Sequence, residues 1–345
     1  MGTIPIVDIH THTIPQSFVD EVRRDSGRHG YSIRRRANGL EELITPDWPT
    51  DAPPEKDLGQ EVVQKRTDEA FRQREMRAAR IDVSVEGILP PLMSYGGDPT
   101  QAEWGARAIN DGLAANCAAF PQNVHGMAHV PLQSPELAAK ELTRVVERYG
   151  FRAVQIGANV RGENLDVREL DPFWDAAQSL GVLVFVHPEH PSGLLRLRKY
   201  WLVNLVGNPL ETTIAGACLI FGGVLERYPR LNVCLAHAGG YTPWIQGRWR
   251  HGAEVRPETK ERGATGGFDQ YFRRLYFDTV IHDPRTLRFL IDSVGSDRVL
   301  HGTDYAADMG DWTQVPTIRG MAGLSESDKT DVLGANALRL MGRAV

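Results

Sequence analysis

The segment "VDIHTHTIP" (residues 7–15) places three polar side chains at alternate positions of an apolar run. On a β-strand, alternate residues face the same side of the sheet. We therefore expect Asp8, His10 and His12 to share one face, with Val7 and Ile9 on the other. The same pattern is also typical of a short strand whose histidines only form hydrogen bonds. This segment alone does not distinguish that interpretation from a functional site, so the rest of the sequence is needed.

Seven further apolar runs follow and alternate with amphipathic segments. In residues 134–150, Leu142 and Val145 fall at helical spacing between a start at Ser134 and a stop at Gly150. Eight strands alternating with helices predict a parallel (β/α)8 TIM barrel. The alternative is an open doubly wound sheet. Such a sheet carries a glycine-rich loop after its first strand, and this chain has none there. The predicted strands are residues 4–10, 83–89, 124–130, 152–157, 182–188, 232–240, 274–280 and 298–304.

Two regions depart from this alternation. Residues 14–65 are rich in charge, proline and glycine and are longer than an ordinary connection. We expect them to form an insertion or small subdomain at the barrel mouth, within one domain that spans residues 1–345. Residues 201–229 are expected to form mainly one long apolar helix, which packs on the barrel or contacts a partner.

The composition is that of a globular protein with a sizeable core, because 41% of the 345 residues are hydrophobic and 24% are charged. The formal net charge of -5 argues against a general nucleic-acid-binding protein. Cys117, Cys218 and Cys234 lie far apart, as expected of free thiols in a reducing compartment. With no leader-like start and no apolar run of about 18 residues, we expect a cytoplasmic protein without a membrane span.

Four histidines and one aspartate lie at the ends of expected strands. In TIM barrels, functional side chains gather at the C-terminal strand ends. Imidazoles with a carboxylate suit zinc and other divalent metals, which lower the pKa of bound water to near 7. We expect His237 to act as the general base beside this water. The residues are His10, His12, His187, His237 and Asp304.

Asp8 allows two interpretations. Its carboxylate either accepts a hydrogen bond from a metal-ligating imidazole or satisfies backbone groups at the barrel floor. His190 lies close to His187 and is a possible pocket residue. Five further histidines have no comparable position and are expected to be core or surface residues. These are His125, His129, His251, His282 and His301.

Taken in order, the motifs of the chain resemble those of the metal-dependent amidohydrolase superfamily, and within it aminocarboxymuconate-semialdehyde decarboxylase and its relatives. The resemblance covers nearly the whole chain and is densest over residues 200–311. The matching pieces are "DIHTH", "VQIG", "FVHP", "KYWL", "NPLETT", "FGGVLERYPRL", "LAHAGG", "GRWRHG", "HDP" and "GTDY".

This resemblance implies one divalent metal, usually zinc and alternatively manganese, with His10, His12, His187 and Asp304 as ligands. It implies that His237 activates the metal-bound water and relays a proton, and that Asp304 also takes part in catalysis.

The resemblance also implies arginines that bind the substrate carboxylate. Arg248 matches one that acts across a homodimer, from the neighbouring subunit. A second arginine precedes the second strand in the family. Here Arg66 is the first candidate, with Arg72 and Arg74 as alternatives.

The chain departs from the family in its expected pocket walls. Glu189 and Asn204 replace aromatic residues, and Ala307 and Asp308 stand where the relative has an aromatic. We expect Glu189 and Asn204 to contact substrate. Added carboxylates would repel a dicarboxylate or accept hydrogen bonds from hydroxyl or amino groups, so the substrate is expected to differ from that of the muconate enzyme.

These features predict a metal-dependent non-oxidative decarboxylase of a small aromatic or muconate-like carboxylic acid. The alternative is a mononuclear hydrolase or hydratase of the same superfamily, acting on an amide, ester, lactone or alkene. Superfamily hydrolases with two metals often carry a lysine at the end of strand 4, where this chain reads "VQIGANV". A third hypothesis is a non-catalytic barrel that only binds a metal or a partner. Replacing His237 in such a protein would leave ligand affinity unchanged, and there would be no activity to lose.

Overall fold

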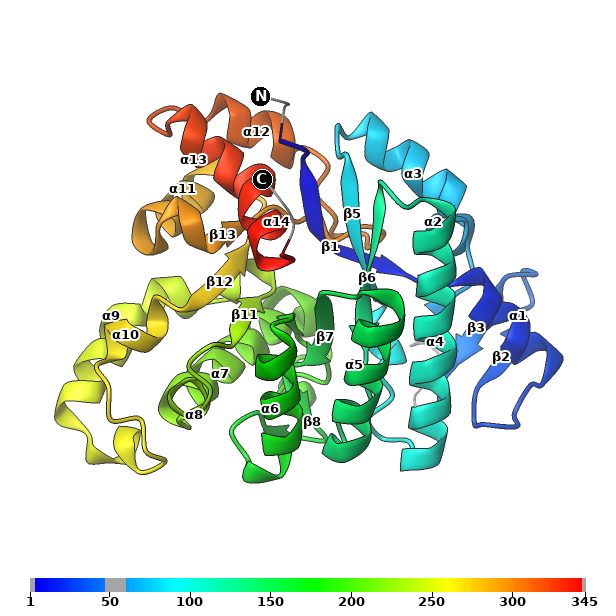
Figure 1. Ribbon diagram of the computed structural model, residues 1–345, viewed down its shortest axis with the longest axis horizontal. Coiled ribbons are helices and arrows are strands. Elements are labelled where there is room, and N and C mark those ends of the chain that lie inside the picture. The colour runs from blue at the N-terminus through cyan, green and yellow to red at the C-terminus, as the bar shows by residue number, and fades with distance from the viewer. Residues whose placement is uncertain (1–3, 47–59, 343–345) are drawn as a thin grey trace.

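The structure is a computed structural model that describes residues 4–46 and 60–342. Eight parallel strands follow one another in the order β1-β5-β6-β7-β10-β11-β12-β13 (Figure 1). The predicted TIM barrel is confirmed, and each expected strand is present. The strands are β1 Val7–Thr13, β5 Val83–Ile88, β6 Val124–His129, β7 Ala153–Gly157, β10 Leu183–His187, β11 Asn232–Leu235, β12 Leu275–Asp278 and β13 Val299–Leu300.

The barrel closes between its last and first strands through the segment after β13. Ile9 N donates to His301 O at 3.0 Å, and Asp304 N donates to His10 O at 2.8 Å. Thr11 and Tyr305 form an isolated parallel bridge. Because β13 itself is short, residues 301–305 complete the seam beside β1.

Helices cover the outside of the barrel (Figure 1). The helix expected over residues 134–150 is α5, Pro135–Tyr149, which follows Ser134 and ends at Gly150 in the left-handed conformation (φ 70°). The other helices are α1 Gln16–Arg24, α2 Gln64–Thr67, α3 Glu69–Ala78, α4 Pro99–Ala119, α6 Asp171–Leu180, α7 Asn208–Phe221, α8 Val224–Arg227, α9 Thr242–Val255, α10 Phe268–Phe272, α11 Pro284–Val294, α12 Gln314–Gly320, α13 Glu326–Thr330 and α14 Asn336–Leu340.

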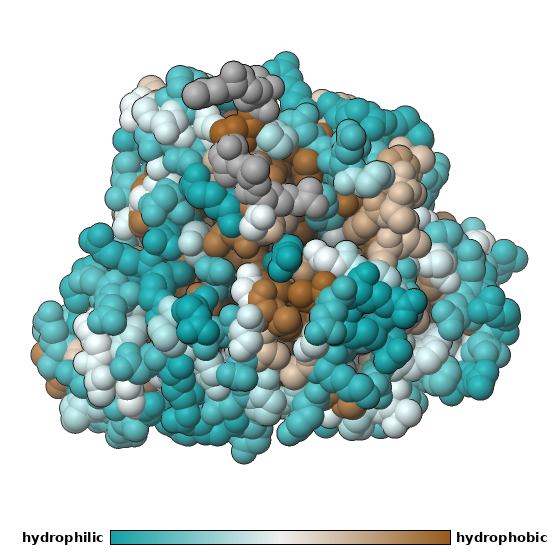
Figure 2. All heavy atoms as spheres, viewed as in Figure 1, coloured by the Kyte–Doolittle hydropathy of each residue, from teal (hydrophilic) through white to brown (hydrophobic). Residues whose placement is uncertain are grey.

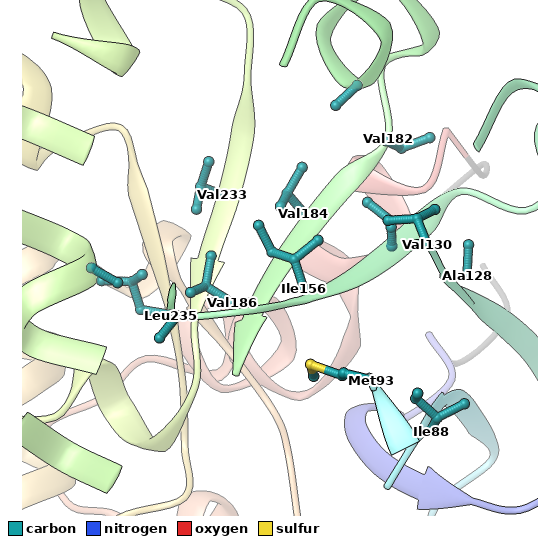
Figure 3. Close-up of a cluster of buried hydrophobic side chains, with 14 of the residues drawn as sticks. Ile88, Met93, Ala128, Val130, Ile156, Val182, Val184, Val186, Val233 and Leu235 are labelled. Carbon is teal, nitrogen blue, oxygen red and sulfur yellow. The ribbon is translucent and has the colours of Figure 1, made fainter. Parts of the chain in front are cut away.

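Alternate strand residues pack into two separate cores. Val184, Val186 and Val233 point outward and pack with helix residues such as Trp174 (Figure 3). The inward side chains fill the barrel below the strand ends, Phe185 among them.

Helix α14 covers one end of the barrel. It contacts β1 and β13, and Leu338 and Met341 join the interior cluster of the barrel. Figure 2 shows hydrophobic side chains near the centre of an otherwise mostly hydrophilic face. This end is therefore packed, and the site must be sought at the C-terminal ends of the strands.

A bulge in β1 changes the expected facing of its side chains. Asp8 pairs with Ser84 and Thr11 with Glu86, so three steps on β1 match two on β5. The extra residue shifts the alternation. Val7 and Ile9 therefore lie in the barrel interior. The expectation that they face away from the two histidines, and that Asp8 shares the histidine face, is wrong.

The single long helix expected over residues 201–229 is also wrong. A turn of π-helix, Val203–Gly207, leads into α7, and the chain breaks at Gly222 and Gly223 before α8. Gly223 is left-handed (φ 72°), and a Cβ at Gly222 would lie 2.1 Å from Asp166 Cβ. The two glycines thus interrupt this mainly apolar segment.

The described part of residues 14–65 contains α1 and a three-stranded antiparallel sheet, β2-β3-β4. The strands are Ser32–Arg35, Glu41–Ile44 and Gln60–Glu61; residues 47–59 lie outside the described part. A separate hairpin, β8 Asn159–Val160 and β9 Glu163–Asn164, follows β7. Over residues 4–46 and 60–342, no helix is both long and apolar enough to cross a membrane.

A buried charge cluster lies between α3 and the barrel. Arg72 and Glu86 are fully buried, and Arg72 Nη2 lies 3.0 Å from Glu86 Oε1. Glu69 lies at the edge of this pair, where its carboxylate accepts from Gln73 and Asn116. Burial, together with the nearby Glu86 carboxylate, raises the pKa of Glu69 to about 8. Glu86 Oε1 accepts hydrogen bonds from Arg72 Nε and Nη2, and Glu69 Oε2 lies 3.4 Å from Arg72 Nε.

Glu69 makes stability depend on pH. Its folded-state pKa is raised above the ordinary 4.5, so its contribution is complete below pH 4.5 and is lost as the pH rises through about 8. We expect Glu69→Gln to flatten this fall, which has an upper limit of about 1.4 kcal/mol per pH unit. Urea unfolding from pH 5 to 9 measures the slope. Glu75→Gln, on the exposed face of α3, is the control; equal slopes in both variants would contradict the assignment.

Candidate metal centre

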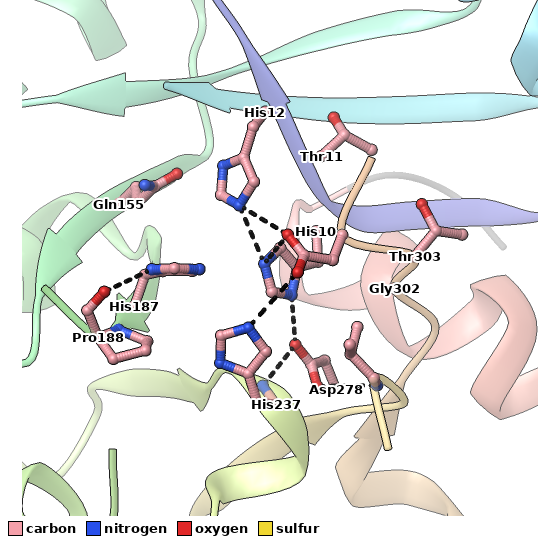
Figure 4. A network of polar contacts seen from close by, with 12 residues as sticks. His10, Thr11, His12, Gln155, His187, Pro188, His237, Asp278, Gly302 and Thr303 are labelled. Atoms are coloured by element: carbon pink, nitrogen blue, oxygen red, sulfur yellow. Dashed lines mark hydrogen bonds and ion pairs between the residues drawn. The ribbon is translucent and has the colours of Figure 1, made fainter. Parts of the chain in front are cut away.

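Five side chains predicted from the strand ends converge at one end of the barrel. His10 and His12 come from β1, His187 ends β10, and His237 lies two residues after β11 (Figure 4). Asp304 lies in the seam segment after β13. His10 Nε2 and His12 Nε2 are 3.2 Å apart. They lie 3.4 and 3.1 Å from Asp304 Oδ1.

The remaining two histidines complete the cluster. The ring centre of His187 lies 4.9 Å from that of His12 and 5.0 Å from that of His237. One ligand atom from each of His10, His187, His237 and Asp304 lies within 4.8 Å of the others. His187 Nε2 is buried and has no hydrogen-bond partner among the described residues. Imidazole nitrogens and one carboxylate at this spacing fit a first-row divalent cation.

Hydrogen bonds on the far side of three rings orient them toward the centre. The Nδ1 atoms of His10, His12 and His187 lie 2.6 Å from Asp278 Oδ2, 2.9 Å from Ile88 O and 2.9 Å from Pro188 O. These acceptors favour the Nδ1–H tautomer, which leaves the Nε2 lone pair free for a metal.

His237 differs from these three rings. Its Nδ1 is buried without a hydrogen-bond partner in the described part of the chain, and its Nε2 lies 3.7 Å from Asp304 Oδ2. Among the described residues, His237 therefore lacks the far-side acceptor that orients the other three rings.

For His12, His187 and Asp304, the electrostatics of the site favour the protonation states that a metal requires of its ligands. Burial lowers the pKa of His12 and His187, and neighbouring histidines lower that of His187 further. Burial alone would raise the pKa of Asp304, but His10, His12 and His237 outweigh it and hold that pKa well below its usual range. For His10, Asp304 and Asp278 outweigh burial and raise the pKa.

Backbone strain coincides with two of these residues. His237 and Ala238 have φ of 54°, and Asp304 has φ of 61°, in the left-handed region that non-glycine residues rarely adopt. Asp278 holds the first two, because its carboxylate accepts from His237 N at 3.0 Å and Ala238 N at 2.7 Å. Strain of this kind persists where surrounding contacts over-determine the conformation.

Asp278 is the site residue that the sequence analysis missed. It ends β12 and contacts both His10 and the backbone of His237, so it supports two members of the centre. The signal was available, since the rule that selected the other residues, a polar side chain at a strand end, also selects Asp278.

Asp8 takes the second of its two expected roles. Its carboxylate accepts from His10 N at 3.0 Å and from Thr303 N at 3.1 Å, and Thr303 Oγ1 donates to it as well. It therefore binds backbone groups at the seam and not a histidine ring.

The three arginines before the second strand lie in different environments. Arg66 O accepts from Ile14 N directly after β1, and Arg66 Nε is buried without a partner among the described residues. Arg72 is occupied by Glu86, and Arg74 is exposed on α3. Of the three, Arg66 combines a position beside the end of β1 with an unused donor.

Arg248 lies on α9 and is exposed. Its guanidinium forms no hydrogen bond or ion pair with any residue over 4–46 and 60–342. Nothing within the described chain thus fixes its guanidinium.

The departures from the family lie around the centre at different depths. Glu189 directly follows Pro188, and its Oε1 lies 3.1 Å from His190 Nδ1. Asn204 is half-buried on the π-helical turn. The Asp308 carboxylate is 86% exposed and lies 3.5 Å from Lys65 Nζ, so it faces solvent.

Comparison with known proteins agrees with this geometry. The amidohydrolase family model matches residues 7–343, and the chain belongs to this family. It is 31% identical to the 2-amino-3-carboxymuconate-6-semialdehyde decarboxylase of Dictyostelium discoideum, over 97% of this chain and 91% of that protein. It is 30% identical to the gamma-resorcylate decarboxylase of a Polaromonas species, over 78% of this chain and 86% of that one.

The fold is also found in a solved structure, a dihydroxybenzoic acid decarboxylase from Polaromonas with bound manganese and the inhibitor 2-nitroresorcinol. The TM-score is 0.78 at 23% identity, over 99% of this chain and 98% of that chain. At this identity the likeness supports the barrel architecture.

Asp278 should matter for metal binding although it is not expected to be a ligand. We expect Asp278→Asn to weaken zinc affinity by about 10- to 100-fold, because the amide cannot replace both of its acceptor oxygens. Competition with a chromogenic chelator measures this affinity. Asp283→Asn, at a partly exposed helix cap after β12, is the control; equal zinc affinity in the two variants would contradict the assignment.

Proposed function

We propose that the chain is a metal-dependent non-oxidative decarboxylase of a small aromatic or muconate-like carboxylic acid. The observation that carries the proposal is the division within one cluster: three imidazoles oriented by far-side acceptors, one carboxylate, and one imidazole with a free Nδ1. Its similarity to named decarboxylases over most of its length supports the reaction class.

In this proposal His10, His12, His187 and Asp304 hold one metal ion. When bound there, such an ion would supply Lewis acidity and would lower the pKa of water beside it to near 7. The three-nitrogen, one-oxygen donor set suits zinc, which we propose as the native metal. Manganese is the alternative, and it is bound in the Polaromonas structure.

His237 moves the proton in the reaction. Its Nε2 lies 3.7 Å from Asp304 Oδ2 and so faces the centre, where it would exchange a proton with the substrate. Protonation of the carbon that bears the carboxylate is followed by cleavage of the carbon–carbon bond. Carbon dioxide leaves, and the bonding electron pair remains with the ring or conjugated chain, so charge and atoms balance.

Arginines and polar pocket residues are proposed to select the substrate. Arg66 is the candidate for the carboxylate within the same chain, since a guanidinium donates two parallel hydrogen bonds to a carboxylate. Glu189 and Asn204 are proposed to bind hydroxyl or amino substituents. A carboxylate at position 189 disfavours a second acidic group on the substrate.

Arg248 is proposed to act across a homodimer. One turn before it on α9, Trp244 is 76% exposed, and its ring lies 5.5 Å from that of Phe289, which is also exposed. Exposed aromatic side chains beside an arginine are characteristic of protein interfaces. A partner subunit would bury them and fix the guanidinium.

Carbon dioxide release tests the proposal. Zinc-loaded protein should release it from at least one member of a panel of hydroxy-, amino- and nitro-substituted benzoates and muconates. A chelator should abolish the release, and added metal should restore it. Turnover of esters, amides or lactones without carbon dioxide release would instead favour the hydrolase alternative.

The role of His237 is tested in the same assay. His237→Asn should retain one metal per chain and lose at least about 100-fold in turnover, the lower range for general acid–base catalysis. His125→Asn, at the opposite end of the barrel on β6, should change neither quantity. Loss of the metal in His237→Asn would show that His237 is a ligand and would contradict this assignment.

A further inference from the structure

Arg72 lies directly behind the metal centre, on α3, with no exposed surface. Its Nη1 donates to His12 O at 2.7 Å and to Lys65 O at 3.2 Å. Its Nε and Nη2 donate to Glu86 Oε1 at 3.2 and 3.0 Å. One guanidinium therefore joins β1, α2 and β5.

The same guanidinium also reaches the seam of the barrel. Its carbon lies 5.0 Å from the ring centre of Tyr305, the residue after Asp304. The backbone N–H of His12 donates to Tyr305 O. Arg72 thus contacts His12 and the neighbour of Asp304, which come from the two ends of the chain.

His12 is fixed at each of its polar groups except the one that faces the centre. Its N–H donates to Tyr305 O, and its C=O accepts from Arg72 Nη1. Its Nδ1 lies within hydrogen-bond distance of Ile88 O. Only Nε2 is left to face Asp304. The contact from Arg72 is therefore one of those that hold the main chain from which the His12 imidazole projects.

We infer that Arg72 is a positioning residue, which sets the places of His12 and Asp304 through the His12 carbonyl and the Tyr305 ring. This inference rests on the proposed metal site. It gives Arg72 a different role from the carboxylate binder considered for it, because all of its donor groups face the protein interior. The planar guanidinium is required, since a lysine ammonium cannot bind Glu86 and the His12 carbonyl in the same fork.

The matched comparison is an arginine with a similar ion pair remote from the centre. Arg144 on α5 donates to both oxygens of Glu141 at 2.7 and 2.8 Å and contacts neither a predicted ligand nor Tyr305. Lysine at either position removes the paired guanidinium hydrogen bonds to a glutamate. The replaced side chain is buried at Arg72 and nearly buried at Arg144. Only the change at position 72 alters the surroundings of His12.

The test measures zinc affinity by chelator competition and the melting temperature of the metal-free protein, in Arg72→Lys and Arg144→Lys. We expect both variants to melt earlier, and only Arg72→Lys to bind zinc about 10- to 100-fold more weakly. Unchanged zinc affinity in a folded Arg72→Lys variant would overturn the inference.

If Arg72→Lys does not fold, zinc affinity is measured in Glu86→Gln instead. This change keeps an acceptor oxygen but removes the charge that holds the guanidinium of Arg72. Weaker zinc binding is then expected, and unchanged binding would overturn the inference. The readout does not depend on turnover. Absence of zinc binding in the unmodified protein would instead refute the proposed function.

Discussion

The metal centre depends on the hydrogen-bonded seam between β1 and residues 301–305. Asp304 N donates to His10 O, so a residue from the end of the chain lies beside one from its beginning. Strand β13 contributes only two residues of regular pairing, and the irregular segment after it supplies the rest. The bulge in β1 and the left-handed conformation of Asp304 lie on this seam. Its geometry brings His10, His12 and Asp304 within contact of one another.

Burying these side chains together costs free energy unless a cation binds between them. Several imidazoles and a carboxylate are removed from water together, and desolvation disfavours the charged form of each. Asp278 and the carbonyls of Ile88 and Pro188 satisfy the far side of three rings. A divalent ion would bind the Nε2 atoms, which lie on the near side of these rings. The second layer of contacts, including Arg72, therefore supports function as much as stability.

The sequence alone was sufficient to predict the barrel, because each strand is a short apolar run and the helices between them are amphipathic. The same strand ends also led to the five residues of the centre. Contacts that depend on irregular backbone could not be predicted in this way. The bulge turned Val7 and Ile9 inward and separated Asp8 from the histidines, and the close approach of Gly222 to Asp166 broke the expected helix. Arg72 looked like a substrate residue because its burial against Glu86 depends on tertiary packing.

The most direct test of the account is a crystal structure of the zinc-loaded protein with anomalous scattering measured on both sides of the zinc edge. We predict one zinc ion, within about 2.0–2.2 Å of Nε2 of His10, His12 and His187 and of an oxygen of Asp304. His237 should lie outside bonding distance. A zinc ion bonded to His237 in place of His12, or a second ion in the same centre, would contradict it.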